Sequence, residues 1–381
     1  MKRVIRLFCV FCAIAIASAS LLACRNSSYD PDTMIFIGAT GPLTGGEASY
    51  GISVQRGATV AVEEINAAGG LNGYTFYFDM RDDQAQATPA ANAYTSLIEA
   101  GMQVSLGSVT SASCLAFANE AKKDNLFFIT PSASAAEVIK EDNAYRICFD
   151  DPDQGRISAE TLAEKYTKIG AIYDSSDTYS KGIFDSFKAE IQKYENVTLT
   201  EASFVEGAVD FNQQVTNLKN AGCEVVYLPI YYTEANLIIR NAVTTQGWQP
   251  DFFGCDGLDG LKALIEQNGF IDTVEGEISY MTAFDAAATD EKTKKFVEDY
   301  KAKYNETPDQ FAADAYDAVY VLYEAMKEAN VTDATISVSD LCEILKSTIS
   351  GEGFVFTGTT GTMTWDASGA PDKEPVIVAL T

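Results

Sequence analysis

The stretch that decides the fold is MIFIGATGPLTGGEASYGISVQRGATVAVEEINAAGGLNGYTFYFD, residues 34–79. It begins with an apolar, β-prone run, Met34–Ala39, and continues in a helical pattern over Tyr50–Ala68. Apolar residues recur there every three or four positions, which is the spacing of one helix face. Two glycines end the helix, and a second β-prone run follows at Tyr74–Asp79. The stretch therefore predicts a strand–helix–strand unit.

The same alternation continues along the chain in two sets, which are separated at Asp150-Asp151-Pro152. Repeated units of this kind predict parallel sheets covered by helices on both faces, and two sets predict an α/β protein of two doubly wound lobes. Further helices are predicted at 88–100, 112–123, 154–168, 180–193, 212–221, 234–246, 258–267, 291–304, 310–329 and 338–349, and further strands at 104–107, 127–130, 144–149, 171–173, 198–204, 225–228, 252–254, 277–281, 355–357, 361–365 and 376–380.

Composition limits the function. The chain has 381 residues, a formal net charge of −27 and no histidine. A chain of this length exceeds what one hydrophobic core usually supports, and its negative charge repels nucleic acid and anionic lipid. The absence of histidine removes Ser-His-Asp and Cys-His catalysis and His-ligated zinc. We therefore expect a binding protein rather than an enzyme, with no metal, no cofactor and no nucleic-acid partner.

The N-terminus has the pattern of a signal peptide. Three basic residues precede an uncharged apolar run over 7–23, which is too short for a comfortable membrane span. Leu21-Leu22-Ala23-Cys24 resembles the bacterial lipobox, in which cleavage precedes the cysteine and its thiol carries lipid. We expect residues 1–23 to be removed, Cys24 to be lipidated, and residues 24–33 to hold the protein outside the cytoplasm. An ordinary secretory signal with an incidental cysteine is the alternative.

The other cysteines of the mature chain do not predict a disulfide framework. They are odd in number and include no CxxC pair, so neither a disulfide set nor a zinc site is predicted. At least one of them must be free or paired between molecules. They are Cys114, Cys148, Cys223, Cys255 and Cys342.

Hydroxyl residues follow two strands of the first set. Ser111 lies in Gly107–Ser113, just before a predicted helix, and Ser132 and Ser134 lie in Thr130–Ala135. Ligands of doubly wound sheets lie beyond the carboxyl ends of the strands. Free N–H groups and hydroxyls at a helix start suit a carboxylate, and the hydroxyls and carbonyls of the second segment suit an ammonium group. Helix capping and a simple turn are the alternatives.

The second set of units places an acid and aromatic residues at strand ends. Tyr231 follows one predicted strand, and Asp256 follows the next within Gly254–Gly257. An acid there can pair with a cation, although an Asx-turn is the commoner role of a loop aspartate. Buried charges need partners of opposite sign, so groups for both charges in two lobes predict a ligand such as an α-amino acid.

Seven segments in this order resemble the leucine/isoleucine/valine-binding family of type I periplasmic binding proteins. The segments are IGATGPLTGGEASYG, GATVAVEEINAAGGLNG, ITPSASAAEV, DPDQG, YSKG, FAADAYDAVYVL and TMTWDASG. The resemblance covers residues 34–381. It implies two αβ lobes joined by three crossover segments: 34–150 plus 283–356 as the first lobe, and 151–282 plus 357–381 as the second.

The resemblance also implies a role for particular residues. Ser111 matches the serine that holds the ligand carboxylate, and Ser132 and Ser134 match the segment that contacts the ammonium group. Asp256 matches the acid that pairs with the ammonium group, where the family commonly has glutamate. Aromatic contacts are implied for Tyr50, Tyr179, Tyr231 and Phe311. A disulfide found in some relatives would join Ala85 and Thr110, and is absent here.

These matches imply the substrate-binding lipoprotein of an ABC importer, which captures a branched-chain or other apolar L-amino acid. Its expected partners are a permease and an ATPase, and it is expected to be a monomer attached to the bacterial cell membrane only through its lipid. The alternatives are a protein of the same fold for an amide, a urea or an aromatic acid, and a sensor that presents its closed form to a signalling receptor. An enzyme is a third class, disfavoured by the missing histidine.

Overall fold

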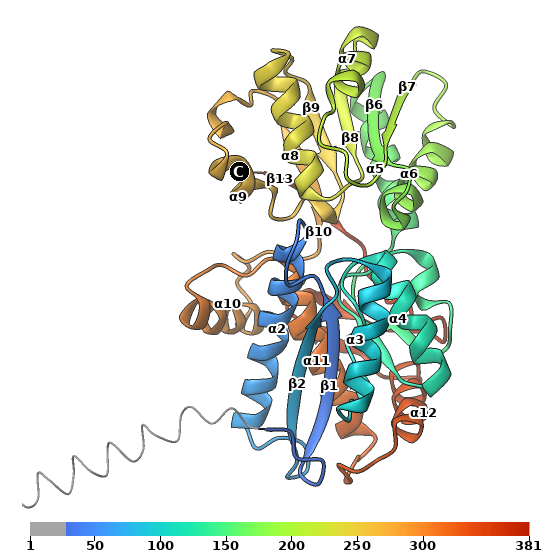
Figure 1. Cartoon of the computed structure of the whole chain (residues 1–381), viewed down its shortest axis with the longest axis vertical. Coiled ribbons are helices and arrows are strands. Elements are labelled where there is room, and N and C mark those ends of the chain that lie inside the picture. Colours follow the sequence, from blue (N-terminus) through green and yellow to red (C-terminus); the bar gives the residue numbers. More distant parts are fainter. Residues whose placement is uncertain (1–27, 381) are drawn as a thin grey trace, which may run out of the picture.

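The computed structural model describes residues 28–380, so the predicted signal peptide and Cys24 lie outside the described range. The chain forms two lobes, drawn one above the other in Figure 1. The lower, first lobe contains a five-stranded parallel sheet in the order β2-β1-β3-β4-β5. Its strands are β1 (Met34–Gly41), β2 (Thr75–Asp82), β3 (Val104–Ser105), β4 (Phe128–Thr130) and β5 (Ala144–Arg146).

The upper, second lobe contains a six-stranded sheet in the order β13-β10-β9-β8-β6-β7. All neighbours are parallel except β13, which runs antiparallel to β10 at the edge. The strands are β6 (Lys168–Asp174), β7 (Thr198–Phe204), β8 (Val225–Leu228), β9 (Asp251–Gly254), β10 (Ile278–Thr282) and β13 (Val376–Ala379).

Helices cover both sheets, as expected for repeated strand–helix units. The helices of the first lobe are α2 (Ala48–Ala67), α3 (Ala87–Glu99), α4 (Ser111–Asp124), α10 (Glu291–Tyr304), α11 (Gln310–Glu328) and α12 (Val338–Ile349). Those of the second lobe are α5 (Asp151–Lys165), α6 (Thr178–Ile191), α7 (Asn212–Ala221), α8 (Tyr232–Arg240) and α9 (Leu261–Gln267). Over residues 28–380, none of these helices combines the length and the apolar character that crossing a bilayer requires.

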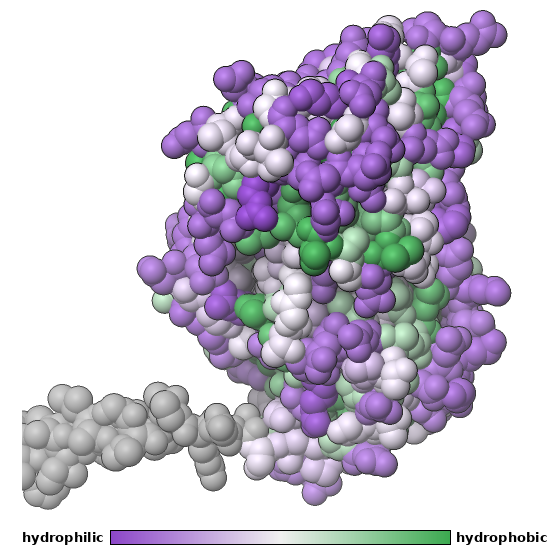
Figure 2. Space-filling model, turned by 45° about the horizontal axis from the view of Figure 1, so that its top comes forward, coloured by the Kyte–Doolittle hydropathy of each residue, from purple (hydrophilic) through white to green (hydrophobic). Residues whose placement is uncertain are grey.

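The chain passes between the two sheets three times, after β5, after β10 and before β13. This arrangement confirms the predicted fold class of two doubly wound lobes joined by three segments. Among the described residues, all five cysteines are buried and free. On the face shown in Figure 2, hydrophilic residues cover most of the surface, in keeping with the large net charge.

The last crossing occurs later than the sequence predicts. The hairpin of β11 (Phe356–Gly358) and β12 (Gly361–Met363) packs on α11 of the first lobe, although residues from 357 onward were assigned to the second. Asp317 of α11 accepts hydrogen bonds from the backbone N–H groups of Thr359 (2.9 Å) and Thr360 (2.8 Å). Only after Lys373 does the chain enter the second sheet. The prediction of 357 is wrong because the hairpin satisfies a buried carboxylate of the first lobe.

The start of α5 was also predicted too late, at residue 154. Asp150 caps this helix by accepting a hydrogen bond from the N–H of Asp153 (2.8 Å), and Pro152 lies in its first turn. Proline is favoured in a first turn because the N–H that it lacks has no helical partner there. The Asp150-Asp151-Pro152 break in the pattern is therefore a helix start, and it places Asp151 at the junction of the two lobes.

Gly57 lets α2 and α11 approach closely. A Cβ atom at this position would lie 1.9 Å from the carbonyl oxygen of Ala312. We expect Gly57→Ala to lower the free energy of unfolding by about 1–3 kcal/mol, the usual cost of overpacking. Gly182→Ala in α6 is the matched control, since its Cβ would meet no atom closer than 3.5 Å and alanine favours a helix. Equal effects of the two substitutions in urea unfolding would contradict this account of the packing.

Candidate functional site

One cavity between the lobes brings together all eight residues predicted as ligand contacts. Its volume is about 10 Å³, so the walls are closed around almost no free space. A space of this size holds about one water molecule, so a ligand enters only when the lobes or the lining side chains move apart. Its walls comprise Tyr50, Ser111, Ser132, Ser134, Tyr179, Tyr231, Asp256 and Phe311, together with Val109, Thr110 and Gly257, which were not predicted.

One wall of the cavity is the N-terminus of α4. The first N–H groups of a helix have no intrahelical partners and lie at its positive end, so they favour an anion. Ser111, which is buried, begins this helix, and its hydroxyl oxygen accepts a hydrogen bond from the N–H of Ala135 (3.2 Å). The hydroxyl proton remains to be donated elsewhere. This wall can therefore donate several hydrogen bonds to a carboxylate.

The neighbouring wall is the segment after β4. Ser132 and Ser134 are both buried, and the carbonyl oxygen of Ser134 accepts hydrogen bonds from the N–H of Asp151 (3.1 Å) and from the Arg146 guanidinium. The Ser134 hydroxyl makes no hydrogen bond of ordinary length among the described residues, although it lies close enough to Asp151 to lower the pKa of that carboxyl. A buried hydroxyl without a partner is unfavourable, so a polar group of a ligand would stabilise it.

The opposite wall carries Asp256, which follows β9 and is only 4% exposed. Its Oδ1 accepts a hydrogen bond from the Tyr179 hydroxyl (2.6 Å), and its backbone N–H donates to Oε1 of Gln154 (3.1 Å). No lysine or arginine among residues 28–380 forms an ion pair with it. Burial raises the pKa of Asp256 to about 6, against the opposing effect of the Tyr179 hydrogen bond. Asp256 is therefore a buried carboxyl that lacks a cation.

Aromatic rings fill the space between these polar walls. Tyr179 and Tyr231 stack with their ring centroids 4.9 Å apart, and Tyr50 lies 4.7 Å from Phe311 and 5.7 Å from Tyr231. Tyr50 and Phe311 belong to the first lobe, whereas the stacked pair belongs to the second. The rings form an apolar lining contributed by both lobes.

Hydrogen bonds join the two lobes around the cavity. The Tyr50 hydroxyl donates to the carbonyl oxygen of Gly257 (2.6 Å) and accepts from the N–H of Tyr232 (3.2 Å). Gln310, at the start of α11, donates from its side chain to the carbonyl oxygen of Asp256 (3.2 Å) and from its backbone to Oδ2 of Asp259 (3.3 Å). The lobes are thus closed on each other, and the site depends on contacts that separation would break.

Asp151 is a residue of this region that the sequence analysis missed. It is 1% exposed, and its Oδ2 atom has no hydrogen-bond partner in the described structure. Burial raises its pKa well above the usual range, and the charge of Asp256 adds to the effect. The sequence does contain a signal for Asp151: it is an acidic residue at the start of α5, directly after the chain crosses from the first lobe to the second.

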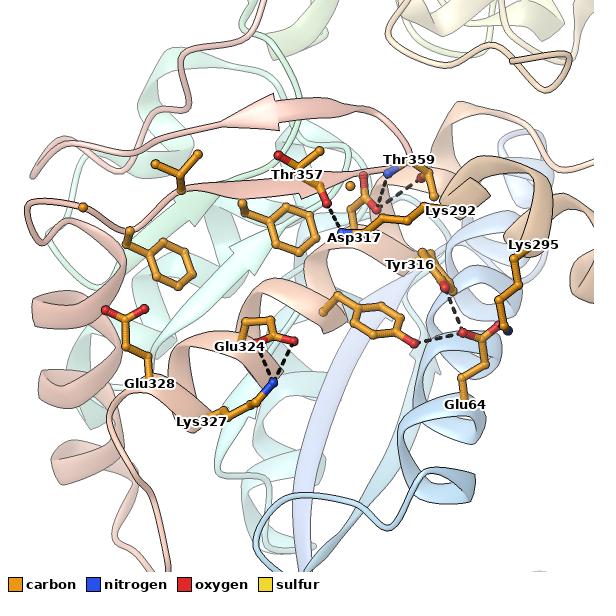
Figure 3. Close-up of a pocket in the computed structure, with 16 residues that line it drawn as sticks. Glu64, Lys292, Lys295, Tyr316, Asp317, Glu324, Lys327, Glu328, Thr357 and Thr359 are labelled. Carbon is orange, nitrogen blue, oxygen red and sulfur yellow. Dashed lines mark hydrogen bonds and ion pairs between the residues drawn. The ribbon is translucent and has the colours of Figure 1, made fainter. Parts of the chain in front are cut away.

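A second, larger hollow lies within the first lobe and is drawn in Figure 3. It has a volume of about 680 Å³ and lies between α2, α10, α11 and the segment leading into β11. Its polar groups satisfy one another: Tyr316 and Tyr320 both donate to Oε2 of Glu64 (2.8 and 2.9 Å), and Lys327 pairs with Glu324 (3.1 Å). The cavity between the lobes is the better candidate site, because within residues 28–380 the buried Thr110 hydroxyl has no hydrogen bond and the buried Asp256 carboxyl has no cation.

Comparison with known proteins defines the class. The model of the periplasmic binding protein family matches residues 34–367, and the chain belongs to that family. A Leu/Ile/Val-binding protein homolog from Brucella melitensis is 29% identical over 329 residues, which cover 85% of this chain and 86% of that protein. A leucine-, isoleucine-, valine-, threonine- and alanine-binding protein from Pseudomonas aeruginosa is 29% identical over 337 residues, or 87% of this chain and 86% of that protein.

Solved structures agree with this assignment. The leucine-binding protein LivK from Thermotoga maritima superposes with a TM-score of 0.79 at 28% identity, over 90% of this chain and 94% of that chain. The branched-chain amino acid substrate-binding protein LivJ from Streptococcus pneumoniae, in complex with isoleucine, gives 0.79 at 29% identity, over 91% and 95%. The expected resemblance to the leucine/isoleucine/valine-binding group is confirmed.

Proposed function

We propose that this protein is the extracytoplasmic substrate-binding component of an ABC importer and captures an L-amino acid between its lobes. The observation that carries the proposal is the pair of unsatisfied polar walls: donors at the start of α4 on one side, and the Asp256 carboxyl without a cation on the other. An α-amino acid has a carboxylate for the donors at the start of α4 and an ammonium group for the Asp256 carboxyl. The relatives named for binding leucine, isoleucine and valine support this ligand class.

Capture would be coupled to closure of the lobes. The donors for a carboxylate lie in the first lobe and Asp256 lies in the second, so a ligand that contacts both favours the closed arrangement over an open one. The closed conformation would then be the one that the transporter recognises. The binding role, rather than catalysis, fits a site made of hydrogen-bonding and aromatic groups.

The partners and the anchor belong to the same proposal. A lipid on Cys24 and a short polar tether would keep the lobes close to a permease and an ATPase in the bacterial membrane. The protein would act there as a monomer. Mass spectrometry of the mature protein tests the anchor, since lipidation of Cys24 predicts a chain that begins at this residue and carries a mass increment removed by Cys24→Ala.

A thermal-shift screen against the twenty amino acids and small amides tests the ligand class. A ligand at 100 times its dissociation constant adds about 2.7 kcal/mol of stability, which shifts the unfolding temperature measurably. At least one apolar or small amino acid should raise the unfolding temperature, and acetamide and urea should not. A response to amides alone would replace the amino-acid assignment with another ligand class of the same fold.

Amino-acid affinity should fall as the pH drops below about 6. Asp256 has a pKa of about 6 in the empty site, raised first by burial. A bound ammonium group stabilises the carboxylate, so the complex has a lower pKa, and binding below pH 6 must release a proton. Affinity should therefore fall up to about tenfold per pH unit. Calorimetric titrations in two buffers of different ionisation enthalpy would detect the released proton.

A second acid pair provides the control for this pH profile. Asp259 of the second lobe and Asp309 of the first face each other across the closed interface, and burial, together with the charge of Asp309, raises the pKa of Asp259 above its usual range. Closure therefore takes up a proton, so the contribution of this pair to affinity falls as the pH rises from the ordinary carboxyl pKa towards the raised one, and is constant above it. Asp259→Asn should remove this proton uptake, so the acidic fall in affinity caused by Asp256 should become steeper. The groups around the pair are Ser53, Asp256, Tyr280, Tyr300 and Gln310.

A further inference from the structure

Thr110 occupies the N-cap position of α4 without capping the helix. Its backbone has the extended conformation usual for an N-cap (φ −89°, ψ 148°), but its side chain accepts no hydrogen bond from the helix N–H groups. Threonine is favoured at this position because its oxygen normally bonds to the N–H two or three residues later. Thr110 departs from this preference, and it also lines the cavity between the lobes.

The Thr110 hydroxyl has no other partner in the described structure. The residue is 5% exposed, and its Oγ1 is among the buried polar atoms without a hydrogen bond. A buried hydroxyl in this condition is unfavourable unless a further molecule completes it.

The ligand carboxylate already has donors at this helix end. The Ser111 hydroxyl and the first N–H groups of α4 are available to it, and Ser134 and Asp256 are available to the ammonium group. Thr110 is therefore a further hydrogen-bonding group beyond those that the two charges of an amino acid need. A purely aliphatic ligand would leave this hydroxyl unpaired after the lobes close.

We propose that Thr110 is a specificity-determining residue that hydrogen-bonds the side-chain hydroxyl of the ligand, so that the site prefers threonine to the isosteric valine. The proposal rests on the proposed amino-acid function and names the ligand class within it. Sites that hydrogen-bond a ligand hydroxyl discriminate strongly against the analogue that lacks it, because their own polar group is then left unpaired. A hydrophobic pocket does not discriminate in this way.

The experiment is a calorimetric titration of the wild-type protein, Thr110→Val and Thr110→Ser with L-threonine and L-valine. L-Threonine carries a hydroxyl group where L-valine carries a methyl group, and the two ligands are otherwise the same. Thr110→Val replaces a hydroxyl with a methyl group in the protein in the same way. The wild type should bind threonine at least about tenfold more tightly than valine, or about 1.4 kcal/mol. Thr110→Val should lose at least this preference, mainly through weaker threonine binding, and Thr110→Ser should retain it.

The other outcomes overturn the proposal in distinguishable ways. Equal weakening of both ligands by Thr110→Val would place the hydroxyl on the carboxylate, and unchanged affinities would show that it contacts no ligand. Valine binding as tightly as threonine to the wild type would refute the preference even if the variant failed to fold. Failure of every amino acid to bind would instead refute the proposed function. Thr110→Val should not lower the unfolding temperature of the empty protein, because no capping bond is lost.

Discussion

Asp256→Asn is expected to weaken amino-acid binding at least about 20-fold. Removing one partner of a buried charge pair typically costs about 2–5 kcal/mol of binding, because the other charge remains buried without a partner. Asparagine has nearly the same shape and keeps an oxygen that can accept the Tyr179 hydrogen bond. The loss would therefore report the missing charge rather than a cavity. Calorimetric titration with the best ligand of the thermal-shift screen measures the effect.

Stability provides the control for this variant. The wild-type site holds a buried carboxyl without a cation, so Asp256→Asn should leave the empty protein as stable as the wild type or more stable. Asp272→Asn, at an exposed position of the same lobe, should alter neither affinity nor stability. Wild-type affinity in Asp256→Asn would remove this residue from the binding site.

Lys373→Met is expected to lower the free energy of unfolding by about 3–5 kcal/mol. Lys373 Nζ lies 2.6 Å from Asp314 Oδ1, the two side chains are each 4% exposed, and Lys373 also donates to Thr360 Oγ1 (2.9 Å). Methionine has a similar length but no charge, so Asp314 would remain buried without its cation. Urea unfolding monitored by tryptophan fluorescence measures the loss.

Lys346→Met is the matched control, because Lys346 pairs with the exposed Asp142 and Glu343 on the surface. Exposed pairs contribute about 0–1 kcal/mol, so this variant should be nearly as stable as the wild type. Adding Asp314→Leu to Lys373→Met should recover part of the loss, since a buried pair can often be replaced by apolar residues. Equal destabilisation by the two lysine substitutions would contradict the assigned role of the buried pair.

Much of the fold could be predicted because its signals are local. The helical spacing over Tyr50–Ala68 and the glycines after it gave α2 to within two residues at each end, and α10 and α12 lie at the predicted positions. The position of the hairpin β11–β12 could not be predicted, because it depends on the buried carboxylate of Asp317. That contact joins residues more than 40 positions apart and leaves no periodicity in the sequence.

The residues of the candidate site likewise include some that the sequence predicts and others that it does not. Ser111 and Asp256 could be found because each follows a strand of a doubly wound sheet, where ligands bind. Asp151 and Thr110 were missed as site residues because their sequence positions have ordinary explanations, a helix start and a helix cap. Only the structure shows that one Asp151 oxygen and the Thr110 hydroxyl have no partner among the described residues. Hydrogen bonds that are not made have no sequence signature.

The most direct test of the account is a calorimetric titration of the protein with its tightest-binding amino acid and with the carboxylic acid that lacks only the amino group. Binding through paired charges predicts one amino acid per chain and an affinity at least about 20-fold lower for the desamino acid, which leaves Asp256 without a cation. Equal affinities for the two compounds would contradict the account, because the ammonium group would then contribute nothing to recognition.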